Sequence, residues 1–260
     1  IPGGLRLSYA TLGAFTKYPT SSYPKQDNSN IKNKKYGFFH SQNDFFLEVA
    51  NELGMIQNEN EFLRHPLAYL VEAADDICYT LIDFEDGINL GWINEEYALE
   101  YLIRLVKDSI DTKKYNSLQH KSDRVAYLRA LSVNSLINDV TEIFMKNEES
   151  ILNGEYLKPI LDKSVYKAQM KDILDISIEK VYNSEEVIEK ELKGYQAINH
   201  LLNVFVKATI NNQKNTMTAF DSLALSCIPK SFIHKNGNLY HQLLDVCCFV
   251  ASLTDSKALE

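Results

Sequence analysis

The stretch PLAYLVEAADDICYTLIDFEDGINLG, residues 66–91, decides the fold of this chain. Its apolar residues recur every three or four positions, which is the period of an α-helix. Proline is favoured in the first turn of a helix and glycine just beyond its end, so Pro66 and Gly91 bracket the stretch. The sequence therefore predicts one helix from Pro66 to Leu90, of about seven turns.

The same helical period recurs along most of the chain. Only 10 of the 260 residues are Gly and 6 are Pro, which argues against a turn-rich β-sandwich or barrel. No strand-like alternation and no internal repeat stands out, and no linker is clear enough to separate two domains. Further helices are predicted at about 5–17, 41–54, 95–110, 122–147, 164–182, 185–212, 216–227 and 238–253. We therefore predict an all-α, multi-helical bundle in which residues 1–260 form a single helical domain.

Charge and cysteine content exclude several classes of protein. The net charge of −8 excludes a broadly basic nucleic-acid-binding protein. Four cysteines cannot form a disulfide scaffold, which favours the reducing cytoplasm. No apolar run approaches the roughly 20 residues that span a bilayer, so no membrane partner is expected. Because the chain opens on Ile1 and ends at Glu260 without a tail-like composition, we expect it to be part of a longer protein.

A helical wheel of residues 66–90 separates acidic from apolar residues. Asp75, Tyr79 and Asp83 follow one another at four-residue intervals, over about 12 Å of helix. The acidic stripe consists of these three residues with Glu72, Asp76 and Asp86. The apolar arc, from about 100° to 280° around the axis from Glu72, is predicted to form the core and consists of Leu70, Val71, Ala73, Ala74, Ile77, Cys78, Leu81, Ile82 and Phe84.

The acidic stripe has two interpretations. Most charged stripes are simply the solvated face of an amphipathic helix. However, like charges four residues apart repel, and no Lys or Arg occurs between Arg64 and Arg104 to compensate them. Such a concentration of carboxylates suits a hard divalent cation such as Mg²⁺ or Mn²⁺. One aspartate on a helix cannot hold a metal alone, so the other ligands would have to come from elsewhere.

A second polar feature precedes this helix. Residues 19–36, PTSSYPKQDNSNIKNKKY, are rich in Asn, Ser and Lys and contain two prolines, which predicts a loop. A loop of this length within a helical domain is typically functional or mobile. Lys17 and Tyr18 come directly before it, and Lys35 lies near its end.

Several segments resemble one known family. RHPLAYLVEAADDICYTLIDFEDG (Arg64–Gly87) closely resembles a signature of the deoxyguanosine triphosphate triphosphohydrolases, a branch of the HD-domain phosphohydrolases. GLRLSYATLGAFTKYP (Gly4–Pro19) and KKYGFF (Lys34–Phe39) resemble further segments of that family, in the same order. Looser matches follow at EKELKGYQAINHLL (Glu189–Leu202) and VASLTDSKAL (Val250–Leu259), so the resemblance extends over most of the chain.

The resemblance implies an HD-domain-like helical fold and the hydrolysis of dGTP to deoxyguanosine and inorganic tripolyphosphate. It further implies that Asp75 is one of four ligands of a divalent metal, Mg²⁺ or Mn²⁺. The residues that it implies for the substrate are Tyr79 and Asp83 at the deoxyribose, Lys17, Tyr18 and Lys35 at the triphosphate, and Glu191 at the base. Cationic side chains at the triphosphate agree with the general need to neutralise phosphate charge during its transfer.

This chain departs from the family in one respect. It contains no His-Asp dipeptide, and none of its six histidines precedes an aspartate. The other three metal ligands and the residues that would activate water are therefore expected upstream of Ile1, and no catalytic residue is identified in the chain. We predict that these 260 residues alone neither bind the metal tightly nor hydrolyse dGTP.

Two alternatives stay open. The chain could be a non-catalytic module that assembles an oligomer or binds a nucleotide or single-stranded DNA, through Lys32, Lys34 and Lys35 with the nearby Lys17 and Lys25. It could also belong to an enzyme that accepts several deoxynucleoside triphosphates, because sequence alone does not settle the base. The resemblance also implies a homo-oligomer, with a hexamer as one form.

Overall fold

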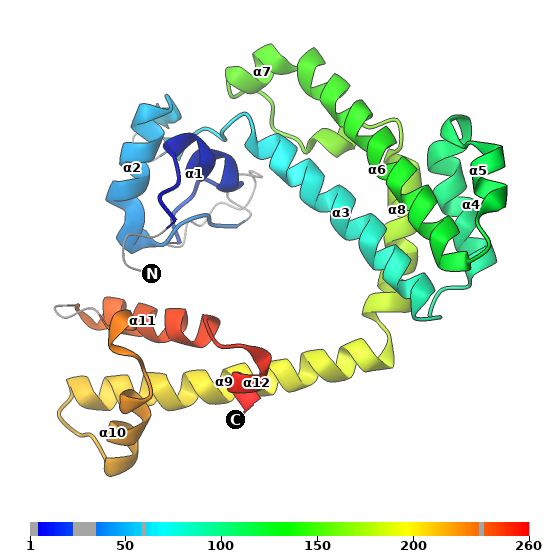
Figure 1. The fold of residues 1–260 in the computed structure, drawn as a ribbon. Coiled ribbons are helices and arrows are strands. Elements are labelled where there is room, and N and C mark those ends of the chain that lie inside the picture. Colours follow the sequence, from blue (N-terminus) through cyan, green and yellow to red (C-terminus); the bar gives the residue numbers. More distant parts are fainter. Residues whose placement is uncertain (1–4, 23–34, 59–60, 234–236, 260) are drawn as a thin grey trace. The chain divides into compact units, whose positions relative to one another are not determined.

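The computed structural model describes residues 5–22, 35–58, 61–233 and 237–259 and is shown in Figure 1. Its described residues form helices together with one short antiparallel hairpin, which confirms the predicted all-α fold. The elements are α1 (Tyr9–Phe15), η2 (His40–Gln42), α2 (Asn43–Glu52), β1 (Ile56–Asn58), β2 (Glu61–Phe62), α3 (Ala68–Asn89), α4 (Glu95–Val106), η3 (Lys107–Ser109), α5 (Thr112–Ser117), α6 (Lys121–Lys146), α7 (Glu148–Leu152), η4 (Ile160–Lys163), α8 (Lys167–Ser177), η5 (Ile178–Tyr182), α9 (Glu185–Gln213), α10 (Ala219–Ser226), η6 (Lys230–Phe232), α11 (Leu239–Ala251) and α12 (Asp255–Leu259).

The chain divides into two compact units, Ile1–Ser184 and Glu185–Glu260. The first unit contains α1 to η5, and the second contains α9 to α12. Each unit has its own hydrophobic core. The single helical domain inferred from the sequence stays a prediction.

Helix α3 organises the first unit. It packs against α1, α6 and α8 (Figure 1). Gly91 terminates the helix with a positive φ of 78°, a backbone conformation that residues other than glycine rarely adopt. Its N–H donates to the carbonyl of Ile88 at 3.0 Å, so one of the last carbonyls of the helix is satisfied. The predicted helix is thus confirmed to within two residues at each end.

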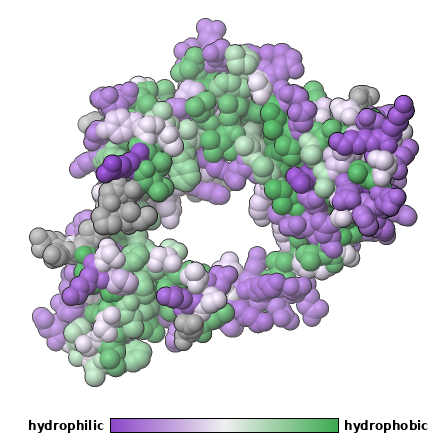
Figure 2. All heavy atoms as spheres, in the orientation of Figure 1, coloured by the Kyte–Doolittle hydropathy of each residue, from purple (hydrophilic) through white to green (hydrophobic). Residues whose placement is uncertain are grey.

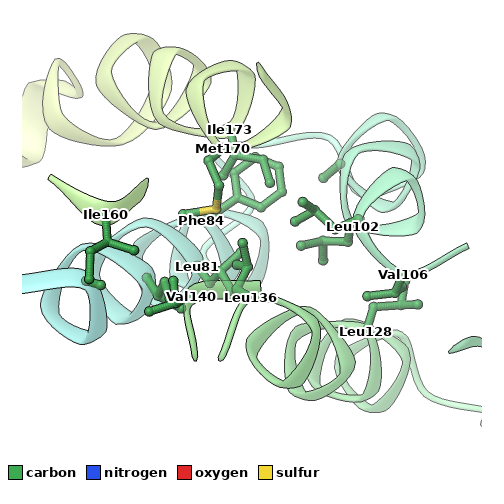
Figure 3. Close-up of a cluster of buried hydrophobic side chains, with 14 of the residues drawn as sticks. Leu81, Phe84, Leu102, Val106, Leu128, Leu136, Val140, Ile160, Met170 and Ile173 are labelled. Carbon is green, nitrogen blue, oxygen red and sulfur yellow. The ribbon is translucent and has the colours of Figure 1, made fainter. Parts of the chain in front are cut away.

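Side chains from α3, α4, α6, α8 and η4 form the core of the first unit (Figure 3). Phe84 and Leu81 of α3 are fully buried in it, and Leu102, Leu136 and Ile173 approach them from the neighbouring helices. Burying a large apolar side chain contributes about 1.5–3 kcal/mol. This core therefore fixes the rotation of α3 about its axis and hence the direction of its acidic stripe.

One part of the core prediction for α3 is wrong. The arc expected to be wholly buried is buried only in its first half, which includes Ala73, Ile77 and Leu81. The residues of the second half are exposed in this unit: Val71, Ala74, Cys78 and Ile82. The physical reason is that α6 and α8 cover one side of α3 and no described element covers the apolar residues beside the acidic stripe.

A small aromatic cluster supports the segment that contains α2 and the hairpin. Phe38, Phe46 and Phe62 are buried, and the rings of Phe38 and Phe46 stack with their centroids 4.2 Å apart. Ile56 lies opposite Phe62 in the two-stranded hairpin, which the sequence pattern did not predict because its strands are only three and two residues long. The cluster anchors the residues that follow the long polar segment.

The second unit is built on the 29-residue helix α9, which packs against α10 and α11. Phe205 of α9 meets Phe249 of α11 edge to face, with ring centroids 5.2 Å apart. Ala208 and Val246 complete the contact. No helix in the described part of the chain is long and apolar enough to cross a membrane.

Candidate functional site

The acidic stripe of α3 has a lysine partner from the start of the chain. Lys17 follows α1, and its Nζ lies 2.5 Å from Oδ2 of Asp75, an ion pair across 58 residues of sequence. The Lys17 side chain is 26% exposed and that of Asp75 is 65% exposed. The structure thus brings together a residue implied for the triphosphate and the residue implied for the metal.

The environment of Lys17 keeps it protonated. Partial burial lowers the pKa of the ammonium, but its hydrogen bond to Asp75 and the charges of Asp75, Asp76 and Glu72 outweigh burial, so the pKa is raised overall. A cation therefore lies permanently on the acidic stripe. The positive charge of Lys17 is available for a phosphate only where that phosphate competes with Asp75.

The two ends of the long polar segment are held together by backbone hydrogen bonds. The N–H of Gly37 donates to the carbonyl of Thr20 at 2.9 Å, and the N–H of Ser22 donates to that of Phe38 at 2.9 Å. As a result Lys35 Nζ lies 5.9 Å from the ring centre of Tyr18, within cation–π range. Two predicted triphosphate contacts, far apart in the sequence, therefore lie side by side, whereas Lys25, Lys32 and Lys34 lie outside the described residues.

Gly37 is required for this close approach. A Cβ at this position would clash with the backbone carbonyl of Tyr18 and would lie 2.5 Å from Cγ2 of Thr16. We expect Gly37→Ala to destabilise the first unit by about 1–3 kcal/mol, the usual cost of forcing an extra group into packed structure. Urea unfolding measures the change.

The matched control for Gly37→Ala is Gly194→Ala. Gly194 lies within α9, and a Cβ there would meet no atom within 4 Å. Because alanine favours helix more than glycine does, this substitution should stabilise the protein by about 0.5–1 kcal/mol. If both substitutions changed the unfolding free energy equally, a steric clash with Tyr18 would not be the reason for glycine at position 37.

Further along α3, Tyr79 and Asp83 share a partner that the sequence did not reveal. The hydroxyl of Tyr182 donates to Oδ2 of Asp83 at 2.5 Å. The rings of Tyr182 and Tyr79 lie 5.7 Å apart at 35°. Tyr182 ends η5, a π-helical turn after α8, 99 residues away from Asp83 in the sequence. The sequence indicated only that a helix ends near residue 182. Nothing in the sequence around Tyr182 indicated a contact with Asp83.

The phenol of Tyr182 should stay protonated at alkaline pH. Burial, its hydrogen bond to Asp83 and its contact with Tyr79 all raise its pKa above the ordinary value of about 10. Because the pKa is raised in the folded state, the protonated hydroxyl contributes fully to the unfolding free energy below about pH 10. This contribution is lost as the pH rises from there through the folded-state pKa.

We therefore expect Tyr182→Phe to lower the unfolding free energy by a constant amount at neutral pH, and the difference from wild type to shrink only above about pH 10. Chemical denaturation across a pH series measures this. Tyr195→Phe is the control, since Tyr195 is 70% exposed and its loss should change stability little. If the difference between Tyr182→Phe and wild type already disappears between pH 7 and pH 10, the hydrogen bond to Asp83 does not stabilise the fold.

Glu72, the first residue of the acidic stripe, is not solvated. Its Oε2 lies 3.0 Å from Nη2 of Arg64, and the two side chains are only 8% and 2% exposed. The Arg64 guanidinium also stacks on the ring of Tyr69, 4.3 Å from its centre. This buried pair joins the segment before α3 to its second turn and therefore holds the start of the stripe in place.

The described residues do not form a complete metal site. Nowhere in the part of the chain that the structure describes do three or more His, Cys, Asp or Glu side chains gather closely enough to hold a metal ion. Asp75 is a single carboxylate already paired with Lys17. A divalent cation takes about six oxygen ligands, so these residues alone do not fit one.

Glu191, the residue implied for the base, lies exposed on α9 in the second unit. Its neighbours Lys190 and Lys193 pair with Glu186 and Glu189 at the helical spacing of four residues. Glu191 thus belongs to the other unit, and its role at the base stays a prediction.

These features define a class: an all-helical protein in which one central helix presents carboxylates and a tyrosine beside lysines from a neighbouring loop. No protein-family model matches the chain. Individual proteins do match. A deoxyguanosinetriphosphate triphosphohydrolase-like protein from Synechocystis is 31% identical over 264 residues, covering 99% of this chain and 59% of that protein.

Two further relatives support this finding. A deoxyguanosinetriphosphate triphosphohydrolase-like protein from Listeria monocytogenes is 31% identical over 279 residues, covering 98% of this chain and 59% of that protein. The deoxyguanosinetriphosphate triphosphohydrolase of Yersinia pestis is 27% identical over 220 residues, covering 77% of the chain and 43% of that protein. The chain is thus related along its whole length to the deoxyguanosinetriphosphate triphosphohydrolase family, as its sequence predicted, and it spans about three fifths of the Synechocystis and Listeria proteins.

Proposed function

We propose that this chain is the part of a metal-dependent deoxynucleoside triphosphate triphosphohydrolase that contacts the sugar and the phosphates of its substrate. The observation that carries the proposal is the placement of Lys17 on Asp75, on the helix face that also presents Tyr79 and Asp83. Lys17 lies at Asp75, and Tyr79 and Asp83 follow within the next two turns of α3. A cation for the phosphates and polar groups for the sugar therefore occur in the same order as the phosphates and the sugar of a nucleotide.

The reaction would cleave the bond between the α-phosphorus and the 5′ oxygen of dGTP. Water supplies oxygen to phosphorus, the 5′ oxygen takes a proton, and deoxyguanosine and tripolyphosphate leave. Lys17 and Lys35 would neutralise charge on the phosphates, with Tyr18 lying against Lys35. Tyr79 and Asp83 would contact the deoxyribose, and Tyr182 would act as a positioning residue because its hydroxyl donates a hydrogen bond to Asp83.

The proposed cofactor is Mg²⁺ or Mn²⁺, with Asp75 as one ligand. The remaining ligands and the groups that activate water would come from polypeptide outside these 260 residues, because the described side chains form no cluster of three or more ligands. The chain alone should therefore be inactive, and a protein of the full length of its relatives should be active. The same protein would act in the cytoplasm as a homo-oligomer.

The decisive experiment measures release of tripolyphosphate from each of the four deoxynucleoside triphosphates and from GTP. It compares the 260-residue chain with the same chain extended to the length of its relatives, with and without Mn²⁺. Release by the extended protein alone, from dGTP and not from GTP, supports the proposal. Release from all four deoxynucleotides would broaden its substrate, and no release from any nucleotide would refute it.

A second candidate is a non-catalytic module that binds nucleotide or single-stranded DNA. It is favoured by the absence of a three-ligand cluster among the described residues and by the lysines at both ends of the polar segment. Binding through lysines to phosphates weakens steeply as salt rises. Salt-sensitive binding of single-stranded DNA by a full-length protein that releases no tripolyphosphate would favour this candidate.

A further inference from the structure

The second unit contains a cavity between its helices. The cavity has a volume of about 240 Å³ and is lined by residues of α9 and α11 and of the segment 225–233 that joins α10 to α11. Pockets for drug-sized ligands measure roughly 300–1,000 Å³, so this one suits a smaller molecule. On the face that Figure 2 shows, hydrophobic residues gather over α10 and the adjacent part of α9, whereas the first half of α9 is hydrophilic. The cavity therefore lies in the more apolar part of this unit.

The lining of the cavity combines apolar walls with buried polar groups. Ile228 and Val246 are buried, and Leu225 is half-buried. Thr209 and Asp245 line the same cavity and are also buried, with Asp245 only 6% exposed. Mostly apolar cavities with a few buried polar groups are the usual form of a small-molecule site, because the polar groups orient the ligand.

The neutral polar groups of the cavity present mainly hydrogen-bond acceptors. The hydroxyl of Thr209 donates its proton to the carbonyl of Phe205 at 2.8 Å, so the oxygen of this hydroxyl remains as an acceptor. The amide nitrogen of Gln242 donates to the carbonyl of Gly237 at 3.0 Å, and its amide oxygen likewise remains as an acceptor. Asn212 is exposed and adds one amide. A ligand that matches this lining carries N–H donors.

Asp245 adds a negative charge to these acceptors. Its charge acts on Cys248, three residues further along α11, where burial and the Asp245 carboxylate together raise the pKa of the thiol. Asp245 has another interaction within the protein. A carboxylate offers about four acceptor sites, so it can accept from a ligand as well. Hydrogen bonds from a cation to a carboxylate are roughly twice as strong as those between neutral groups.

We propose that this cavity binds a small organic cation, an amidinium or ammonium group attached to an apolar body. The cationic group would lie at Asp245, and the apolar body would lie against Leu225, Ile228 and Val246. Acceptors and a negative charge disfavour phosphates, so the ligand differs in kind from a nucleotide. The inference does not depend on the proposed function, because the residues assigned to phosphate and sugar belong to the first unit and the cavity belongs to the second.

The test measures the Kd of benzamidinium, a phenyl ring with an amidinium group, for the whole 260-residue chain by NMR titration. Benzamide is the matched neutral probe, because it has nearly the same shape and no charge. We expect saturable binding of benzamidinium and at least about tenfold weaker binding of benzamide, which is the factor that a hydrogen bond to a charged group contributes.

Three variants locate the site. Asp245→Asn should weaken the binding of benzamidinium at least about tenfold, because it removes the charge. Ile233→Trp should weaken it by a similar factor, because Ile233 lines the cavity and the larger indole would occupy the space of the ligand. The control is Asp255→Asn, which removes an exposed carboxylate from α12 of the same unit and should change the Kd less than about twofold.

Circular dichroism checks that each variant folds. Ile233 is 49% exposed, so its replacement keeps the test decisive even where Asp245→Asn does not fold. A preference for benzamidinium over benzamide, with binding lost in Ile233→Trp and in a folded Asp245→Asn, supports the proposal. No saturable binding, equal binding of the two probes, or an unchanged Kd in Ile233→Trp overturns it. Equal weakening by Asp245→Asn and Asp255→Asn also overturns it, because the cation would then be attracted only by the net negative charge of the chain.

Discussion

Asp75→Asn in the chain extended to the full length of its relatives should lower tripolyphosphate release at least about a hundredfold. Loss of a group that merely orients a metal ligand costs 10–100-fold in metal affinity or activity, so loss of a ligand itself should cost at least as much. Asn keeps the size of the side chain but removes its charge. It also removes the pairing that opposes the effect of burial on Lys17, whose pKa should fall.

The control for Asp75→Asn is Asp86→Asn. Asp86 is exposed on the same acidic stripe, eleven residues further along α3, and no role is assigned to it. Its loss should leave turnover within about twofold of wild type, the scale of a weak surface charge. A second readout separates binding from catalysis: Mn²⁺ should raise the melting temperature of the wild type and not that of Asp75→Asn. Near-normal turnover and an unchanged shift in Asp75→Asn would remove Asp75 from the site.

Glu72→Ala should destabilise the first unit by about 3–5 kcal/mol, the usual cost of leaving one member of a buried ion pair without its partner. Arg64 is 2% exposed and cannot move its charge into water without disturbing the start of α3. Its Nε and Nη1 are buried and have no hydrogen-bond partner among the described residues, so the contact with Glu72 is the main compensation for its charge there. Urea unfolding followed by circular dichroism measures the loss.

Two comparisons make this result specific. Glu142→Ala removes an exposed pair with Lys146 on α6 and should change stability hardly at all. The double substitution Arg64→Leu with Glu72→Met replaces both charges by apolar groups and should recover most of the stability that Glu72→Ala loses. If the double variant is as unstable as the single one, packing and not the buried charge explains the effect.

The sequence predicted α3 well because its signals are local. The apolar spacing and the glycine after its end act within a few residues, and they define the helix and its acidic stripe. Most other long helices were also predicted near their observed positions. The short elements α5, α7, α12 and the hairpin were missed, because two to six residues are too few to show a period.

The counter-charges of the carboxylates on α3 could not be predicted from its local sequence. The absence of Lys and Arg between Arg64 and Arg104 indicated that the carboxylates of α3 lacked counter-charges. In the structure Lys17 pairs with Asp75 and Arg64 pairs with Glu72. Coulombic attraction depends on distance in space, so a cation 58 residues away in the chain can neutralise a helix whose own sequence contains none.

By itself the sequence determined the helical class, the position of α3, the residues on its acidic stripe and the relation to the triphosphohydrolase family. Only the tertiary structure showed that Tyr182 holds Asp83, that Gly37 closes the loop between Tyr18 and Lys35, and that half of the apolar arc of α3 stays open. The periodicity of a helix reveals which residues share a face, but what covers that face is decided by elements that pack against it from distant parts of the chain.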